Sequence, residues 1–257
     1  MSNLRQGIDH GVLVRFWSLD HHRAEPVLWP VSPWPKLVYA AEGTLQVETD
    51  QQLWILPANR ALWVDAGESH RSATLGKARV RTLYFSPSMN IQQQNGILDV
   101  PPLLRELIVE SCSAGPLIAG DSRLEALAIL LQFEVEKASM IPSGIVMPQS
   151  DWMREWASQF IDNPLEPPPC SWSRRTMERQ MLKETGLTLG QWCQQARAVV
   201  GLRALSTGAT VGEAAVEAGF ATSSGFVHSF RKRFGTTPGS ISRDLLKSSQ
   251  LETIPHH

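Results

Sequence analysis

The sequence predicts an α+β protein with two domains, an all-β N-terminal part followed by an all-α C-terminal part. Between residues 12 and 87, short apolar runs alternate with Gly, Pro, Asn and Asp, as expected for many short strands. From residue 101 onward, apolar residues recur at helical spacing. A length of 257 residues with 42% hydrophobic content is enough for about two domains, each with its own core.

The predicted strands lie at residues 37–41, 45–49, 54–56, 60–64 and 80–85, each bounded by turn-forming residues. Their number and length predict a jelly roll or a small barrel. The chain has nine tryptophans, and Trp17, Trp29, Trp34, Trp54 and Trp63 fall in this part. Indole rings inside a barrel can enclose a flat or apolar small molecule, or they can fill the core, and both interpretations stay open.

Two helices are predicted in the middle of the chain, after a break at residues 95–102. The first spans residues 101–113, and its apolar face is formed by Leu103, Leu104, Leu107 and Ile108. Asp121 and Ser122 can cap the second helix, whose apolar surface is wider than packing on one side requires. This surplus favours dimerisation, with coverage of the barrel alone as the alternative. Residues 139–149 contain two prolines and no helical period, so they are predicted to form the domain boundary.

The strongest pattern in the chain lies at residues 210–238. A short predicted helix has Ala214, Ala215 and Ala218 on one face and ends at Gly219, because glycine readily adopts positive φ. The next helix begins near Thr222 and has three phenylalanines on its core face, at residues 226, 230 and 234. Two such helices, with polar and basic residues outside, are typical of a DNA-binding helix-turn-helix; an ordinary two-helix corner is the alternative.

On the second of these helices the outward residues are candidates for DNA contact. We expect base edges to be contacted by Ser223, Ser224, Val227 and His228. We expect the phosphate backbone to be contacted by Thr222, Arg231 and Lys232. The charge balance agrees, because residues 150–247 hold 12 basic and 9 acidic side chains, whereas residues 1–149 hold 12 and 15.

The spacing G-F-x-x-x-S-x-F-x-x-x-F-(R/K)-(R/K)-x-F-G-x-(T/S)-P resembles the second helix-turn-helix of the AraC/XylS family of bacterial transcription regulators. Further upstream, SRRTMERQMLKETGLTLGQW resembles the recognition helix of that family's first unit, and residues 189–205 resemble its connecting helix. The resemblance makes Ser173 the helix cap and implies groove-facing roles for Arg174, Arg175, Glu178 and Arg179. This chain departs from the pattern at LEPPPCSW, where three prolines exclude a helix interior, so the first unit is predicted to be shortened.

The N-terminal run LVYAAEGTLQVET, followed by LPANRALWVDAGESHRS, resembles the cupin sensor domain of many AraC-type regulators. The resemblance implies an effector cavity, with Tyr39, Trp54, Trp63 and His70 as its candidates. Pro30 and Ser32 stand where the related pattern has two histidines, which leaves His70 alone of the ligand set. Because a catalytic metal needs about three protein ligands, we expect no metal and no cofactor.

The implied protein is a transcriptional regulator with a cupin-like domain at 1–100, a helical linker and dimerisation segment at 101–149, a DNA-binding domain at 150–247 and a disordered tail at 248–257. Expected partners are double-stranded promoter DNA, a small-molecule effector, RNA polymerase if the protein is an activator, and a second copy of the chain. No catalytic residue is expected. The alternatives are a cupin-type metal-dependent oxygenase fused to a binding module, and a degenerate regulator with impaired DNA binding.

Two further expectations concern the cellular environment. The N-terminus lacks the apolar middle of a secretory signal, and no apolar run reaches about 18 residues, so the protein is expected to be cytoplasmic and to make no membrane contact. The three cysteines, Cys112, Cys170 and Cys193, are widely spaced. We therefore expect reduced thiols and neither a disulfide framework nor a zinc site.

Overall fold

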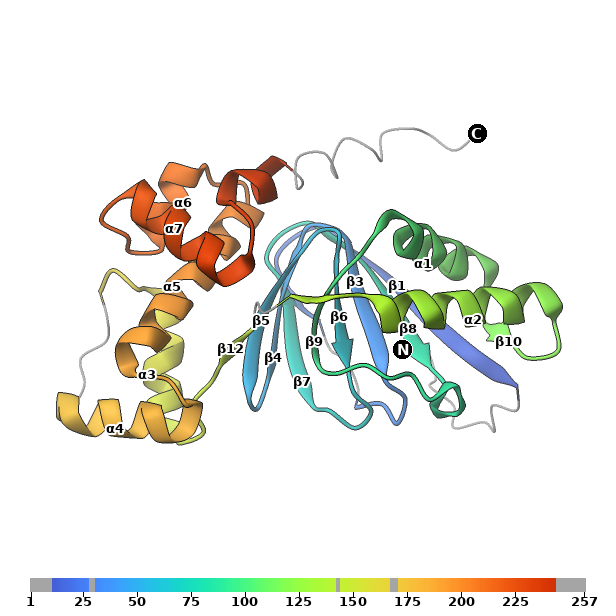
Figure 1. Ribbon diagram of the computed structural model, residues 1–257, viewed down its shortest axis with the longest axis horizontal. Helices are drawn as coiled ribbons and strands as arrows, with labels where there is room; N and C mark the ends of the chain where they lie inside the picture. The colour runs from blue at the N-terminus through green and yellow to red at the C-terminus, as the bar shows by residue number, and fades with distance from the viewer. Residues whose placement is uncertain (1–10, 28–30, 142–143, 167–170, 244–257) are drawn as a thin grey trace.

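A computed structural model describes residues 11–27, 31–141, 144–166 and 171–243 (Figure 1). It confirms the predicted α+β class, with strands in the N-terminal part and helices in the C-terminal part. The three prolines at 167–169, Pro30, Cys170 and the predicted tail lie outside the described residues. None of the helices in the described ranges has the length and apolar character of a membrane span.

Two antiparallel sheets form the N-terminal part. The larger sheet has the strand order β10 (Leu117–Ile118), β1 (Val12–His21), β8 (Ala78–Phe85), β3 (Lys36–Glu42), β6 (Arg60–Val64), β9 (Gly96–Asp99), β11 (Met140–Ile141). The smaller sheet has the order β12 (Ile145–Val146), β5 (Gln52–Pro57), β4 (Thr44–Thr49), β7 (His70–Thr74), β2 (Pro26–Val27). Between β8 and β9 a single 3-10 turn spans Pro87–Met89.

Successive residues of a strand point to opposite faces of its sheet, and this alternation divides the N-terminal core in two. Val38 and Ala40 of β3 pack between the two sheets, in one buried cluster with Leu45 of β4. Leu37 and Tyr39 of the same strand belong to another cluster, on the opposite face of the larger sheet. This second cluster exists because helices cover that face.

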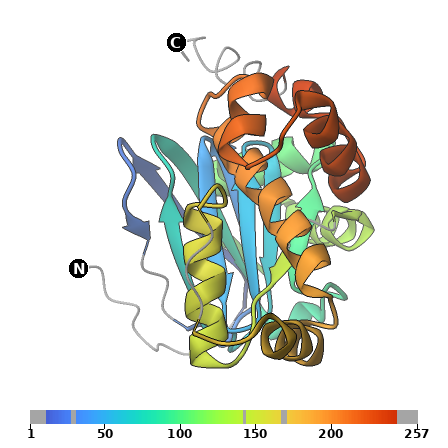
Figure 2. The same cartoon turned by 90° about the vertical axis from the view of Figure 1, so that its left-hand side faces the viewer.

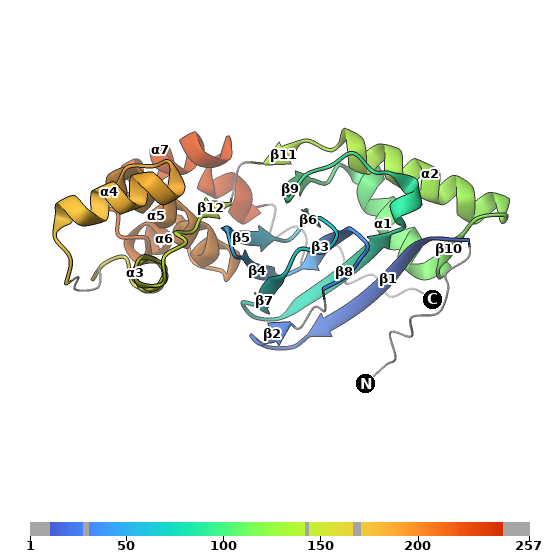
Figure 3. The ribbon, with the colours of Figure 1, turned by 90° about the horizontal axis from the view of Figure 1, so that it is seen from below.

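The covering helices are α1 (Pro102–Ala114) and α2 (Ser122–Lys137), which lie on the side of the barrel away from the C-terminal helices (Figures 1 and 3). Asp121 caps α2, as predicted, by accepting hydrogen bonds from the backbone N–H groups of Arg123 and Leu124. Two expectations at this scale are wrong. Leu103 is exposed, because the buried face of α1 begins one residue later, and residues 96–99, predicted as part of a break, form β9 against β6.

The segment at residues 139–149 contributes a strand to each sheet. Met140 and Ile141 pair with β9, and Ile145 and Val146 pair with β5. Its short apolar stretches show no helical period because they are extended edge strands. The chain therefore leaves the N-terminal part along the outer edge of the smaller sheet.

Helices α3 (Asp151–Asp162), α4 (Arg174–Thr185), α5 (Leu189–Ser206), α6 (Val211–Glu217) and α7 (Ser223–Phe234) form most of the C-terminal part (Figure 2), and a further helical segment spans residues 238–243, where the described residues end. The long helix α5 contacts α3, α4, α6 and α7. Its inward residues follow the prediction, since Trp192, Ala196, Val199, Val200 and Leu205 are all buried. Helix α5 is therefore the core element of this part.

The C-terminal core continues into the smaller sheet without a break. Leu53 and Ile55 of β5 belong to the same buried cluster as Trp192 of α5. The indole Nε1 of Trp192 donates a hydrogen bond of 2.7 Å to the carbonyl oxygen of Val146 in β12. We call this contact region, formed by β5 and β12 on one side and α3 and α5 on the other, the domain seam. The strand β12 thus serves both the sheet and the helical core.

Polar side chains hold the two ends of the domain seam. At one end, Arg154 of α3 forms an ion pair of 3.2 Å with Glu48 and also donates to the carbonyl oxygen of Asp50, at the tip of the β4–β5 hairpin. At the other end, Arg233 of α7 donates to the carbonyl oxygen of Gly144. Helices α3 and α7 therefore each form a polar contact with the smaller sheet or with the residues that directly flank its strands.

Candidate nucleic-acid interface

Helix α7 is seated by a row of aromatic residues. Phe226, Phe230 and Phe234 follow one another at helical spacing and are all buried, with ring centroids 5.4 Å and 4.5 Å apart along the row. Phe226 lies directly against Gly201 of α5, where a Cβ atom would overlap its ring. Because residue 201 of α5 is glycine, α7 can pack closely against α5.

The helix begins at the predicted residue. Thr222 is the N-cap, and its hydroxyl oxygen accepts a hydrogen bond of 3.1 Å from the backbone N–H of Gly225. The turn before it is formed by Gly219, whose φ of +73° suits glycine, and by Phe220, whose ring contacts Phe226. This α6–turn–α7 arrangement is the predicted helix-turn-helix.

The preceding helix α6 is short, and its N-terminus is capped. Thr210 and Glu213 form a reciprocal capping box, in which Glu213 accepts hydrogen bonds of 2.8 Å from both the backbone N–H and the hydroxyl of Thr210. These hydrogen bonds lower the pKa of Glu213 below its ordinary value. Ala214, Ala215 and Ala218 are buried, as predicted, so the helix fits closely against its neighbours.

The structure brings the predicted α7 residues together on one outer face. Two adjacent rows at i, i+4 spacing are formed by Ser223, Val227 and Arg231 and by Ser224, His228 and Lys232. All six except Val227, which is half-buried, are exposed. Small hydroxyl residues at the start of the helix and cations at its end suit contact with bases in a groove and with the phosphates beside it.

Helix α4 presents the second set of predicted residues. Ser173 caps it by accepting a hydrogen bond of 3.2 Å from the backbone N–H of Thr176. Met177 and Met181 are its buried residues, and the predicted groove-facing residues Arg174, Arg175, Glu178 and Arg179 are all exposed. The Nε of Arg174 donates to Glu178 at 2.9 Å, so these two side chains neutralise each other, whereas Arg175 and Arg179 form a separate row.

The first unit lacks a helix in front of α4 among residues 163–166 and 171–173, which are the described part of that connection. Trp172 lies there instead, and its ring packs on that of Trp152 with centroids 5.1 Å apart. This pair could not be predicted from sequence, because the two tryptophans are not at a helical spacing from each other. The two indoles therefore connect the start of α3 with the residues just before α4.

The C-terminal end of α4 is tied to the start of α3 by Glu184. Its carboxylate accepts hydrogen bonds from the backbone N–H groups of Gln149, at 2.9 Å, and Ser150, at 3.2 Å. Partial burial acts in the opposite direction, but these bonds and one from Gln180 hold the pKa of Glu184 below its ordinary value. Sequence reasoning missed this residue, because the cap is 34 residues away along the chain.

Helix α5 contacts both candidate DNA-binding helices, with α4 and α7 at its opposite ends (Figure 2). An 18-residue helix such as α5 is about 27 Å long, and packed neighbours add the width of their own side chains. Successive major grooves on one face of a duplex lie about 34 Å apart. The length of α5 is therefore compatible with contact between α4 and α7 and two neighbouring grooves.

The four residues predicted for an effector cavity are not brought together. Tyr39 and Trp63 point to the face covered by α1 and α2, where Trp63 packs on Phe85 and donates to Asp65 at 2.9 Å. Trp54 packs between the sheets, and His70 lies on β7 of the smaller sheet. Strand alternation, which places odd and even residues of β3 and β6 on opposite faces, is the reason for this division.

The residues present do not fit the metal that cupin domains often hold. No group of three His, Cys, Asp or Glu side chains lies close enough to bind an ion among the residues with described positions. His21 of β1 has its Nδ1 at 2.7 Å from Oε1 of Glu25, so that nitrogen is already engaged. Burial and, to a smaller extent, the charge of Lys36 lower the His70 pKa to about 4, and both oppose a cation beside His70.

Comparison with known proteins agrees with this geometry. A helix-turn-helix domain family matches residues 170–244. The HTH-type transcriptional regulator NimR of Escherichia coli K12 is 26% identical over 212 residues, which cover 79% of this chain and 78% of NimR.

Similar solved structures share a much lower sequence identity. ToxT from Vibrio cholerae is 11% identical, with a TM-score of 0.36, and the match covers 90% of this chain and 98% of ToxT. The AraC-like transcriptional activator CuxR is 10% identical, with a TM-score of 0.39, and the match covers 93% of this chain and 77% of CuxR. The family match over residues 170–244, the similarity to NimR and the two capped helices all indicate a DNA-binding helix-turn-helix transcriptional regulator, in agreement with the resemblance of the sequence to the AraC type.

Proposed function

We propose that this regulator binds promoter DNA mainly through α7, that α4 makes a weaker second contact, and that the N-terminal domain modulates binding through the domain seam. The observation that carries the proposal is the outer face of α7, where two rows of polar and basic side chains stand on a helix with a fully packed aromatic core. A helix fixed before binding loses little further entropy on the DNA.

Helix α4 is built less firmly for the same task. It buries two methionines, which are flexible side chains, and one of its three predicted arginines is already paired with Glu178. Arg175 and Arg179 remain for guanine edges or phosphates. We therefore assign most base discrimination to Ser223, Ser224, Val227 and His228, with backbone contacts from Thr222, Arg231 and Lys232.

The domain seam supports a modulating role for the N-terminal domain. Arg154 bonds α3 to the domain seam, and Arg233 bonds α7 to it. A displacement of β5 would therefore move α3 and α7 relative to each other. A small-molecule effector that binds the barrel has this route to the DNA-binding face. We further propose that the protein acts in the cytoplasm, that it catalyses no reaction and, if an activator, that it contacts RNA polymerase.

An apolar stripe on α2 supports self-association. Four neighbouring residues of its outer face are exposed: Ala126, Ile129, Leu130 and Phe133. The opposite face of the helix already packs on the barrel through Ala128, Leu131 and Val135. A second copy would bury the stripe from water, as an isologous dimer does.

Gel shifts on the DNA upstream of the protein's own gene test the proposal. With excess non-specific competitor, the wild type is expected to form a discrete complex. Substitution of Ser224 and His228 by Ala should abolish this complex, whereas substitution of Arg175 and Arg179 by Ala should weaken it less. If the wild type gives no complex on upstream DNA, the degenerate-regulator alternative is favoured.

Metal analysis of the purified protein tests the oxygenase alternative, which stoichiometric iron or manganese would support.

A further inference from the structure

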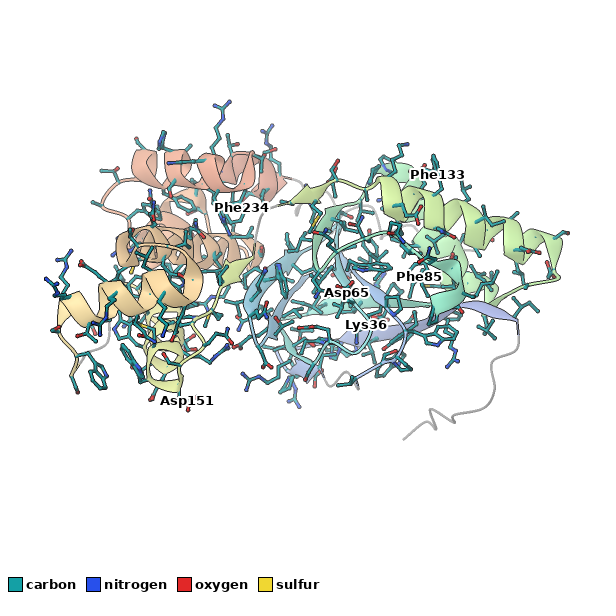
Figure 4. All side chains as sticks on the ribbon, turned by 60° about the horizontal axis from the view of Figure 1, so that its bottom comes forward. Lys36, Asp65, Phe85, Phe133, Asp151 and Phe234 are labelled. Atoms are coloured by element: carbon teal, nitrogen blue, oxygen red, sulfur yellow. The ribbon has the colours of Figure 1, made fainter. Side chains whose placement is uncertain are left out.

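The connection that follows α3 packs directly on the turn of the second helix-turn-helix unit. Helix α3 starts at Asp151, on the side of the helical part opposite Phe234 of α7 (Figure 4), and the chain beyond its far end reaches Gly219. A Cβ atom at Gly219 would lie 3.3 Å from the carbonyl oxygen of Pro164. Pro164 is buried, although the residues on either side of it are exposed. The shortened first unit is therefore covered where it meets the second unit.

Arg197 of α5 lies at the same contact. Its Nε would be 3.4 Å from a Cβ atom at Gly219, and the centre of its guanidinium group is 5.8 Å from the centre of the Phe160 ring in α3. The Nε atom is shielded from solvent, and it has no hydrogen-bond partner within the described ranges. Arg197 therefore lies between the two units, and its Nε is enclosed by packing and not by a hydrogen bond.

The close approach depends on glycine at position 219. A Cβ atom there would approach both Pro164 and Arg197 more closely than ordinary van der Waals contact allows, so one of them would have to move. Gly235, which ends α7, has nearly the same left-handed backbone, with φ of +70° against +73° at Gly219, but nothing lies within 4 Å of its Cβ position. Close packing between the units therefore distinguishes Gly219 from a glycine that only ends a helix.

We infer that Arg197 is a positioning residue that, together with Pro164 and Gly219, fixes the first unit relative to the second and so sets the distance between α4 and α7. The inference rests on the proposed contact of these two helices with successive major grooves. A connecting helix alone leaves each unit free to tilt on it, whereas a direct contact between the units supplies a second fixed point. The contact matters in this chain because no helix precedes α4 among the described residues 163–166 and 171–173.

Helix α3 has further anchors to α5 that do not involve Arg197. Nη2 of Arg203 donates a hydrogen bond of 3.1 Å to the carbonyl oxygen of Ile161, and the rings of Phe160 and Trp192 lie 6.0 Å apart. Arg197→Ala should therefore loosen the contact between the units without detaching α3 from α5. Alanine has the highest helix propensity, so the substitution should not disrupt α5 itself.

Binding to DNA of altered spacing tests the inference. The two probes are the upstream DNA fragment and the same fragment with one base pair inserted between its two protected segments, which rotates them by about 35° relative to each other. The wild type is expected to bind the native spacing about tenfold more tightly or better. Arg197→Ala and Gly219→Ala should each reduce this ratio to about threefold or less. Misfolded protein lowers both apparent affinities alike, so the ratio reports the position of the units and not their stability.

Gln194→Ala and Gly235→Ala are the controls, and both should keep the wild-type ratio. Gln194 is exposed on the same helix as Arg197, and Gly235 has the left-handed backbone of Gly219 without its close neighbours. If Arg197 contacted a phosphate instead, Arg197→Ala would weaken binding to both probes equally and keep the ratio. That result, or a wild type that binds both probes equally, would overturn the inference.

Hydrogen exchange of the full-length protein without DNA tests the contact separately from the proposed function. The backbone amides of Asn163, at the end of α3, and of Gly219 and Phe220, in the turn, are all hydrogen-bonded. In Arg197→Ala, peptides that span either segment are expected to exchange about fivefold faster or more, and in Gln194→Ala at the wild-type rate. Faster exchange in only one segment, or in neither, would overturn the inference even if α7 binds DNA. A wild type that binds neither probe would contradict the proposed function, and the exchange measurement would still decide the contact.

Discussion

His228 and Arg231 are neighbours on the outer face of α7, but they are assigned different kinds of DNA contact. His228→Ala is expected to change the preference at one or two base pairs by about 1 to 3 kcal/mol each. Arg231→Ala should weaken all sequences alike and lower the salt dependence by about one phosphate contact. Competition binding against single-base variants of the site, at two salt concentrations, distinguishes the two. Equal loss on specific and random DNA for His228→Ala would refute its assignment to a base edge.

His70 should make stability depend on pH in the acid range. Burial and the charge of Lys36 lower its pKa in the folded protein to about 4, from an ordinary value of 6.5. Between these values the unfolded chain binds the proton more readily, so the free energy of unfolding falls as pH drops from about 6.5 to about 4, by about 3 kcal/mol at most. Urea unfolding at pH 7 and pH 5 measures the effect. His70→Gln should lose most of it, and an unchanged pH dependence in that variant would exclude His70 as the source.

At the scale of elements, the two recognition helices are expected to differ in local stability. Helix α4 buries Met177 and Met181, whereas α7 buries three phenylalanines and Ser229. Fewer buried contacts give a lower free energy of local opening, so backbone amides of α4 should exchange hydrogen faster than those of α7. Mass spectrometry after hydrogen exchange measures both helices in one sample. Equal protection would show that the Trp152–Trp172 pair and the Glu184 cap fully replace the missing helix.

The elements that could be predicted from sequence are those with a strong local pattern. Helices α5, α6 and α7 have clear periodicity and capping residues, and Thr210, Thr222 and Ser173 cap helices as their side chains allow. The short strands β9, β11 and β12 could not be predicted, because four residues or fewer become strands only through pairing with a distant edge. Tertiary contact, not local preference, decides their structure.

Only part of the candidate site could be predicted from sequence, for similar reasons. Residues of α4 and α7 could be placed on an outer face from helical spacing alone. The effector candidates could not, because their sequence pattern did not show which face of the larger sheet the helices α1 and α2 would cover. The burial of Lys36 could not be predicted either, because one lysine in an apolar strand gives no sign that its side chain points inward.

At the scale of the whole molecule, Gly144 tests whether the domain seam joins the two parts into one unit. A Cβ atom at this position would overlap the ring of Trp54, so Gly144→Ala must displace β12 from β5. We expect a loss of about 1 to 3 kcal/mol and a broader or two-step unfolding transition by calorimetry. Gly190→Ala is the control, because nothing lies within 4 Å of that Cβ in α5. A single sharp transition in Gly144→Ala would mean that the seam does not couple the domains.

The central claim is that α4 and α7, fixed by α5, contact two successive major grooves and that α7 makes the stronger contact. A hydroxyl-radical footprint on the upstream DNA measures this directly. The expected result is two protected segments on one face of the duplex, about one helical turn apart, with the α7 segment retained at higher salt. Loss of the stronger segment in Ser224→Ala with His228→Ala would assign it to α7. Two equally persistent segments that depend equally on the α4 arginines, or no protection at all, would contradict the claim.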